Sequence, residues 1–90
     1  MFNRSVIREE VIHVVNKQLK VNLGRDATNL RLRKDLNMYY SDLVKIIIQL
    51  EMKYHLIIPD EDMNEFKNID EIISFIFRNI EIEEDEFSFS

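Results

Sequence analysis

The sequence predicts an all-α protein, a four-helix bundle with three longer helices and one short helix. Two observations support this fold class. Among 90 residues there is one Gly and one Pro, the two residue types that helix interiors tolerate least. Apolar residues make up 46% of the chain and recur in three segments at the spacing of one helix face. A chain of this length forms one domain, which we place at residues 1–80.

The first helix is expected over residues 5–20. Ser5 precedes the periodic segment and supplies a side-chain oxygen that could cap the free amides of the first turn. Large apolar residues then recur at three- and four-residue steps, which places them on one buried face. They are Ile7, Val11, Val14, Val15 and Leu19.

A loop is expected over residues 21–40, because Asn, Asp, Thr and Gly side chains there favour turns over helix. We expect Leu30 and Leu32 to turn into the core. Between and after them stand basic residues that should face water. They are Arg31, Arg33 and Lys34, with Arg25 earlier in the loop.

The second helix is expected to begin at Tyr40 or Ser41. The Ser41 hydroxyl, as the expected cap, and the Asp42 carboxylate both suit the exposed amides of its first turn. Its apolar residues cover a wide arc, which has two interpretations: a central position in the bundle, which we favour, or an outward apolar patch for partners. Pro59 ends an extended segment, and a short third helix is expected over residues 60–66.

The fourth helix is expected to begin with the capping-box pattern Asn68-x-x-Glu71. Isoleucines follow at helical spacing and predict one fully buried face. They are Ile69, Ile72, Ile73, Ile76 and Ile80.

Charge is distributed unevenly along the chain. Of seventeen acidic residues, five lie in residues 81–90, where there is no basic residue, so residues 1–80 hold twelve acidic and twelve basic residues. Such a block of like charge is expected to form a disordered acidic tail. The alternative is that the tail folds back on the basic loop that contains Arg25 and Arg33. With no Cys, no leader and no membrane-spanning apolar run, we expect a soluble, cytoplasmic monomer.

The segment from Asp35-Leu36 to Leu50-Glu51, continued by Ile58-Pro59-Asp60-Glu61, resembles the centre of an acyl carrier protein. In that family an Asp-Ser-Leu motif precedes the helix, and phosphopantetheine esterifies the serine. Counting back ten residues from Leu50 places Tyr40 at the serine position, so the motif reads Tyr39-Tyr40-Ser41 here.

The resemblance implies candidate sites around this motif. A phenol reaches further than a serine hydroxyl and has a pKa of about 10, so a transferase shaped for serine is not expected to accept Tyr40. Ser41 is the only nearby aliphatic hydroxyl and the alternative attachment site. Asp42, Lys45 and Ile48 are the candidate contacts to partner enzymes, and Lys45 stands where carriers typically have Glu.

Other kinds of site find weak support in the sequence. The stretch Asp60-x-Asp62-x-Asn64 imitates a calcium loop but has Glu65 at the place of the required Gly, so no metal is expected. No Gly-rich phosphate loop or Cys nucleophile is present. A balanced body with an acidic tail also lacks the electrostatic footprint of a nucleic-acid-binding protein.

The resemblance therefore implies a carrier-like protein, not an enzyme, that docks to partner enzymes of acyl or aminoacyl transfer. Two forms stay open. In one, phosphopantetheine is attached at Ser41. In the other, the protein is a cofactor-less interaction module that retains the carrier fold.

Overall fold

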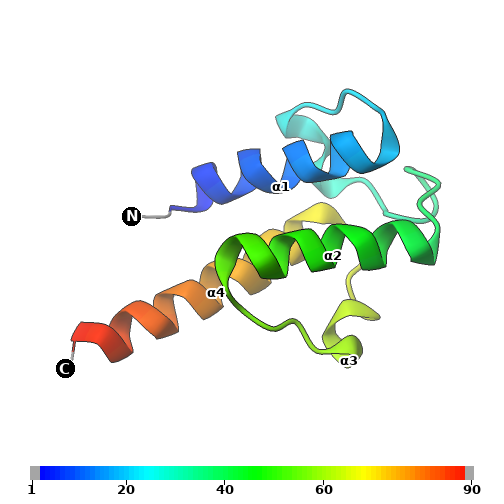
Figure 1. Ribbon diagram of the computed structural model, residues 1–90. Coiled ribbons are helices and arrows are strands. Elements are labelled where there is room, and N and C mark those ends of the chain that lie inside the picture. Colours follow the sequence, from blue (N-terminus) through cyan, green and yellow to red (C-terminus); the bar gives the residue numbers. More distant parts are fainter. Residues whose placement is uncertain (1–2, 89–90) are drawn as a thin grey trace.

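The structure is a computed structural model that describes the backbone of residues 3–88 and the side chains of residues 3–80. Its elements follow in the order α1 (Arg4–Leu19), the 3-10 turn η1 (Arg25–Asn29), α2 (Tyr40–Tyr54), α3 (Asp60–Met63) and α4 (Ile69–Ser88) (Figure 1). Across these residues the only extended pairing is the single bridge between Arg31 and Asn68. The predicted all-α class, with three longer helices and one short helix, is confirmed.

Helix α1 begins one residue before the predicted cap. The side chain of Asn3 accepts a hydrogen bond from the Val6 amide at 2.9 Å, so Asn3 and not Ser5 is the N-cap. The prediction of Ser5 was wrong because two polar residues precede the apolar repeat and the periodicity does not choose between them. At the same end, the Arg4 guanidinium contacts both the Asp70 carboxylate and the Ser74 hydroxyl at 2.8 Å, which ties α1 to α4.

The core lies where α1 packs against both α2 and α4. Burial of such apolar side chains is the main stabilising contribution in a domain of this size. The predicted periodic positions of α1 and α4 are confirmed as its members. Its fully buried large side chains are Ile7, Val11, Val15, Ile46, Leu50, Ile69, Ile72, Ile73 and Ile76.

The long loop between α1 and α2 is held down at several points. The side chain of Asn16 pairs with the backbone of Leu23, donating to its oxygen at 3.1 Å and accepting from its nitrogen at 2.8 Å. Leu32 is buried as predicted, but Leu30, which was also expected in the core, is only half-buried. Met38, for which there was no prediction, is buried as well. Arg31, Arg33 and Lys34 are exposed, as the sequence predicted.

Helix α3 ends at Met63 and is shorter than the predicted residues 60–66. Helix α4 starts as the capping pattern predicted, because the Asn68 side chain accepts from the Glu71 amide at 2.9 Å. The Glu71 carboxylate reaches back to the Lys67 amide, one residue before the expected partner. The helix runs to Ser88. Because the side chains of residues 81–90 lie outside the described residues, the predicted acidic tail and its division from the domain at residue 80 stay a prediction.

None of the helices in the described part of the chain is long and apolar enough to cross a membrane.

Candidate functional site

The first turn of α2 is the place where the sequence analysis located the motif, and the structure presents it at the surface. Tyr39 is the N-cap residue, Tyr40 the first helical residue and Ser41 the second. Tyr39 is 67% exposed and Tyr40 is 50% exposed. Both tyrosine rings are therefore open to solvent and to partners rather than buried in the loop.

Asp42 organises this turn. One of its carboxylate oxygens accepts a hydrogen bond from the Tyr39 amide at 3.1 Å, and the other accepts from the Gln18 side chain on α1 at 3.2 Å. A carboxylate at the third helical position also suits the positive end of the helix dipole. Asp42 therefore fixes where α2 begins and joins that point to α1.

The prediction that Ser41 caps α2 was wrong. Because Asp42 fixes Tyr39 as the N-cap, Ser41 falls inside the first turn instead of before it. Its side chain is exposed, and its hydroxyl has no hydrogen-bond partner within the described part of the chain. The hydroxyl is consequently free for chemistry or for contact with another molecule.

A small pocket of about 130 Å³ opens beside the two tyrosines. Leu32, Met38, Leu43 and Phe66 make its walls apolar, and Arg33 and Asn64 also line it. Tyr40 borders this pocket while keeping half of its surface exposed. The site thus combines an aromatic rim, an apolar hollow and one unpartnered aliphatic hydroxyl.

Further along α2 an exposed stripe continues from Ser41. Lys45, Ile48 and Met52 follow it at steps of three and four residues, and all three are exposed. Ile48 is 49% exposed, whereas Ile46 and Ile47 beside it are buried. Helix α2 therefore buries part of its wide apolar arc, with Ile46, Ile47, Leu50 and Tyr54 inside, and leaves Ile48 and Met52 outside.

A second, larger hollow lies next to the motif. It measures about 610 Å³ and carries four basic side chains, Arg31, Arg33, Lys34 and Lys67, against one acidic side chain, Glu71. Asn29 and Asn68 complete its polar lining, and Leu32 and Phe66 form its apolar part. We call this hollow the basic groove. The loop cations are close together in sequence and were predicted as a group, but Lys67 was missed because it follows Lys34 by 33 positions.

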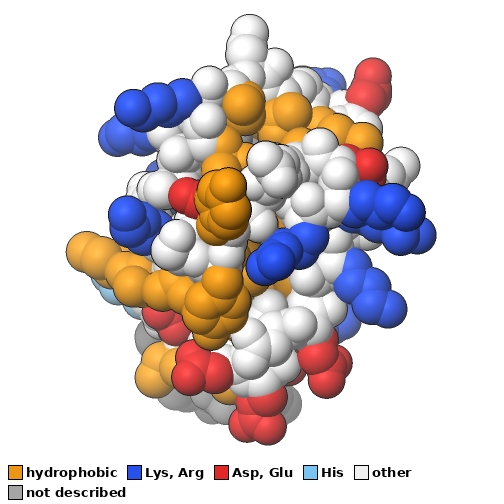
Figure 2. Space-filling model, turned by 90° about the vertical axis from the view of Figure 1, so that its right-hand side faces the viewer, with side chains coloured by type: hydrophobic (Ala, Val, Ile, Leu, Met, Phe, Trp, Pro, Cys, Tyr) orange, Lys and Arg blue, Asp and Glu red, His pale blue; other side chains and the backbone are white. Residues whose placement is uncertain are grey.

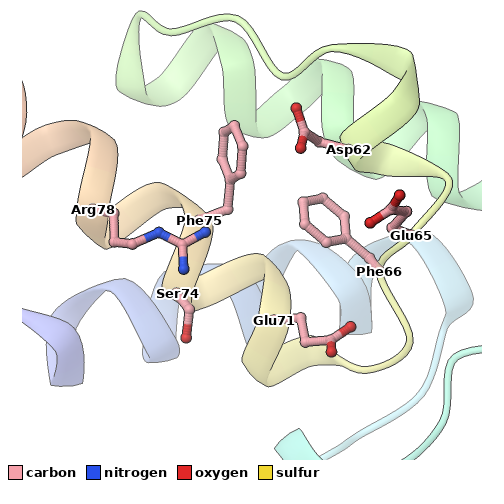
Figure 3. A pocket seen from close by; sticks show the side chains of 7 residues that line it. All are labelled: Asp62, Glu65, Phe66, Glu71, Ser74, Phe75 and Arg78. Atoms are coloured by element: carbon pink, nitrogen blue, oxygen red, sulfur yellow. The ribbon is translucent and has the colours of Figure 1, made fainter.

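A third hollow, of about 330 Å³, lies between α3 and α4 (Figure 3). Figure 3 shows Asp62 and Glu65 near α3 and Arg78 on α4, with the rings of Phe66 and Phe75 between them. The two rings meet edge to face at 5.8 Å between centroids. Among the described residues, no three or more His, Cys, Asp or Glu side chains gather to hold a metal ion.

One buried titratable group lies away from these hollows. The Tyr54 hydroxyl donates a hydrogen bond to the Glu10 carboxylate, which also faces the Lys53 ammonium at 3.7 Å. Burial raises the pKa of Tyr54, and the hydrogen bond to Glu10 and its charge raise it further. The phenol therefore stays protonated and acts as a structural link between α1 and α2.

Comparison with known proteins finds relatives along most of the chain, although no protein-family model matches it. A 71-residue segment, 79% of this chain, is 32% identical to 93% of the acyl carrier protein of Helicobacter hepaticus. The acyl carrier protein of Thermosynechococcus vestitus is 32% identical over 74 residues, which are 82% of this chain and 91% of the relative. That of Helicobacter pylori strain J99 is 30% identical over 71 residues, 79% of this chain and 91% of the relative.

Proposed function

The chain belongs to the acyl carrier protein family, and from that membership we propose that it is a divergent carrier-like protein that docks to enzymes of acyl or aminoacyl transfer. Members of this family carry groups between enzymes and do not catalyse reactions themselves, so this chain is not an enzyme. The observation that carries the proposal is the length of the match, which takes in more than 90% of each of these relatives. The family also supports a cytoplasmic, monomeric carrier domain at residues 1–80.

The proposed divergence lies at the attachment position. Tyr40 is ten residues before Leu50, as the family's serine would be, and α2 runs without interruption between them. Because the helix has no insertion or kink, the spacing in sequence supports the same placement in space. The family's serine position is then held by the phenol of Tyr40.

The residues at this turn fit phosphopantetheine unequally. The Tyr40 phenol does not fit, because its oxygen lies several ångströms further from the backbone than a serine hydroxyl and has different acidity. Ser41 has the right chemistry and is exposed and unpartnered. Its place one residue later moves it by about 100° around the helix and 1.5 Å along it.

Ser41 is therefore the residue that would hold the group, and when bound the group supplies a long flexible arm for the cargo. The surrounding residues would have separate roles. Asp42 holds the first turn in place through Tyr39 and Gln18. Exposed Ile48 and Lys45, on the stripe that starts at Ser41, would contact the partner enzyme.

A second candidate function is favoured by Tyr40 itself. If no residue of the first turn is loaded, the protein is an interaction module that retains the carrier bundle and its docking surface without a cofactor. Its exposed tyrosines, at 67% and 50%, are side chains that commonly serve as anchors in protein interfaces.

Intact mass spectrometry distinguishes these functions. The protein is incubated with coenzyme A and a broad-specificity phosphopantetheinyl transferase, alongside the variants Ser41→Ala, Tyr40→Ser and the double variant. If the natural protein is loaded and the Ser41→Ala variant is not, Ser41 is the attachment site and the protein is a carrier. Circular dichroism of each variant checks that the bundle is intact.

Loading of Tyr40→Ser alone would assign the module, because it shows that only the nucleophile is missing. The double variant separates the two hydroxyls, since any loading there must use the restored serine. If folded Tyr40→Ser and the natural protein both stay unmodified, the transferase does not dock, and the carrier-like proposal is contradicted.

A further inference from the structure

The basic groove has no role in the function proposed so far, although it opens beside the start of α2. We infer that it is a docking site for an acidic segment of a protein partner. The inference rests on the proposed function for the kind of partner, an enzyme of acyl or aminoacyl transfer. It adds the chemistry of that partner's surface.

The groove is a built feature of the fold. The Leu32 amide donates to the Lys67 oxygen at 2.9 Å, and the Leu32 oxygen accepts from the Met38 amide at 2.9 Å. The bridge between Arg31 and Asn68 continues this pairing. These bonds hold the loop before α2 against the start of α4, so cations from both segments border one hollow.

Among the residues whose side chains are described, the cations of the groove have no ionic partner. The ion pairs among the described residues involve Arg4, Arg25 and Lys53, all outside the groove. Four basic side chains against Glu71 leave the lining with an excess of three positive charges. Such a potential attracts acidic partners over a distance of about 10 Å at moderate salt.

The nearby carboxylates serve the backbone. Glu71 accepts from the Lys67 amide at 2.5 Å, and Asp35 accepts from the Arg31 amide at 2.8 Å. Each bond stabilises one of the two segments that carry the cations, Asp35 the segment of Arg31 and Glu71 that of Lys67. Among the described residues neither carboxylate forms an ion pair with a groove cation, so the lining keeps its excess of three positive charges.

Apolar surface accompanies these charges. Leu32, Arg33 and Phe66 line both the basic groove and the small pocket beside Tyr39 and Tyr40, so the two hollows are neighbours that share a wall. Figure 2 looks at this end of the molecule, where exposed hydrophobic side chains run through the middle with basic side chains on both flanks. Acidic side chains gather mainly at the lower end of this view.

This combination favours a peptide segment as the occupant. The groove's four basic side chains are exposed, and rim charges of this kind set the rate and specificity of protein association. Exposed aromatic rings beside them offer an apolar anchor. We therefore commit to a partner segment in which acidic residues alternate with apolar ones.

Fluorescence anisotropy tests the inference on the full-length chain. The probe is a labelled ten-residue peptide of alternating Glu and Leu, and the matched probe has Gln in place of Glu. We expect the Glu peptide to bind, and to bind less tightly at 200 mM than at 20 mM salt. Its affinity should be clearly higher than that of the Gln peptide. The charge-reversed variant Arg33→Glu/Lys34→Glu should weaken binding at least about tenfold.

Lys17→Glu/Lys20→Glu is the matched control, because it makes the same charge change at exposed positions outside the groove. It should retain most of the binding. Equal loss in both variants, or equal binding of the Glu and Gln peptides, would overturn the inference, with circular dichroism confirming that both variants are folded.

Light scattering on the same samples identifies the occupant. If the natural chain self-associates and Arg33→Glu/Lys34→Glu abolishes this self-association, the groove binds the acidic residues 81–90 of a second copy. This result would overturn the inference that a separate protein is the partner. The loading test stays independent. If loading fails but the Glu peptide binds, the carrier function is contradicted and the inference about the groove is supported. If loading succeeds but the Glu peptide does not bind, only the inference about the groove is contradicted.

Discussion

Replacing Asp42 tests how the start of α2 is held. In Asp42→Ala the Tyr39 amide loses its acceptor at 3.1 Å, and the Gln18 side chain loses its acceptor at 3.2 Å. Loss of a capping acceptor costs about 1 kcal/mol, and loss of one partly exposed hydrogen bond costs about 0.5–1.5 kcal/mol. Since Asp42 is half-buried, we expect the free energy of unfolding to fall by about 1–2 kcal/mol.

Urea denaturation followed by circular dichroism measures this loss. For a domain of this size, the same change lowers Tm by roughly 5–12 °C. Asp42→Asn keeps one acceptor oxygen and should lose less than Asp42→Ala. Lys45→Ala is the control on the same helix, because Lys45 is exposed and has no ion pair among the described residues.

A double-mutant cycle with Gln18→Ala isolates the link between α1 and α2. The coupling between Gln18 and Asp42 should be about 0.5–1 kcal/mol, since the two side chains share one hydrogen bond. If Asp42→Ala stays within about 0.5 kcal/mol of the natural protein, as Lys45→Ala should, then Asp42 does not determine where α2 begins and the account of this site is wrong.

Two further predictions concern the core and the buried phenol. Ile76→Ala, at a fully buried position, should lower the free energy of unfolding by about 2–5 kcal/mol, whereas Ile57→Ala, at 81% exposure, should change it by less than about 0.5 kcal/mol in the same urea measurement. Because the pKa of Tyr54 is raised above its ordinary value of 10.0, the stabilisation it provides is complete below pH 10 and is lost as pH rises further. Between pH 8 and 11 the free energy of unfolding should therefore fall more steeply in the natural protein than in Tyr54→Phe. Parallel pH dependences of the two proteins would contradict the role of the protonated Tyr54 phenol.

The elements were predictable to the extent that they are local. The apolar period of α1 and α4 follows from which residues stand three and four apart, and the capping pattern at Asn68 acts over four residues. The errors lie at helix ends. Ser5 and Ser41 were chosen as caps by residue type, but Asn3 caps α1, and at α2 the acceptor is the carboxylate of Asp42, which was expected to act beside Ser41. Several polar residues compete at each end, and small differences in geometry decide among them.

The candidate site was predictable in position but not in surroundings. Counting from Leu50 placed Tyr40 and Ser41 at the start of α2, where the structure has them. The bond from Gln18 to Asp42 spans 24 residues, and no local pattern indicates it. This hydrogen bond could be predicted only once the packing of α1 against α2 is known.

The sequence by itself determined the helical class and the faces that enter the core, because periodicity is a property of the chain, and its identity to known carriers determined the family. The resemblance had already indicated Ile48 as a surface contact, but only the tertiary structure decided how the wide apolar arc of α2 divides, with Ile46 and Ile47 buried and Ile48 exposed. It also decided that Lys67 joins the cations of the loop at one groove. The physical reason is that burial and electrostatic potential depend on distances between segments, and those distances exist only after the helices have packed.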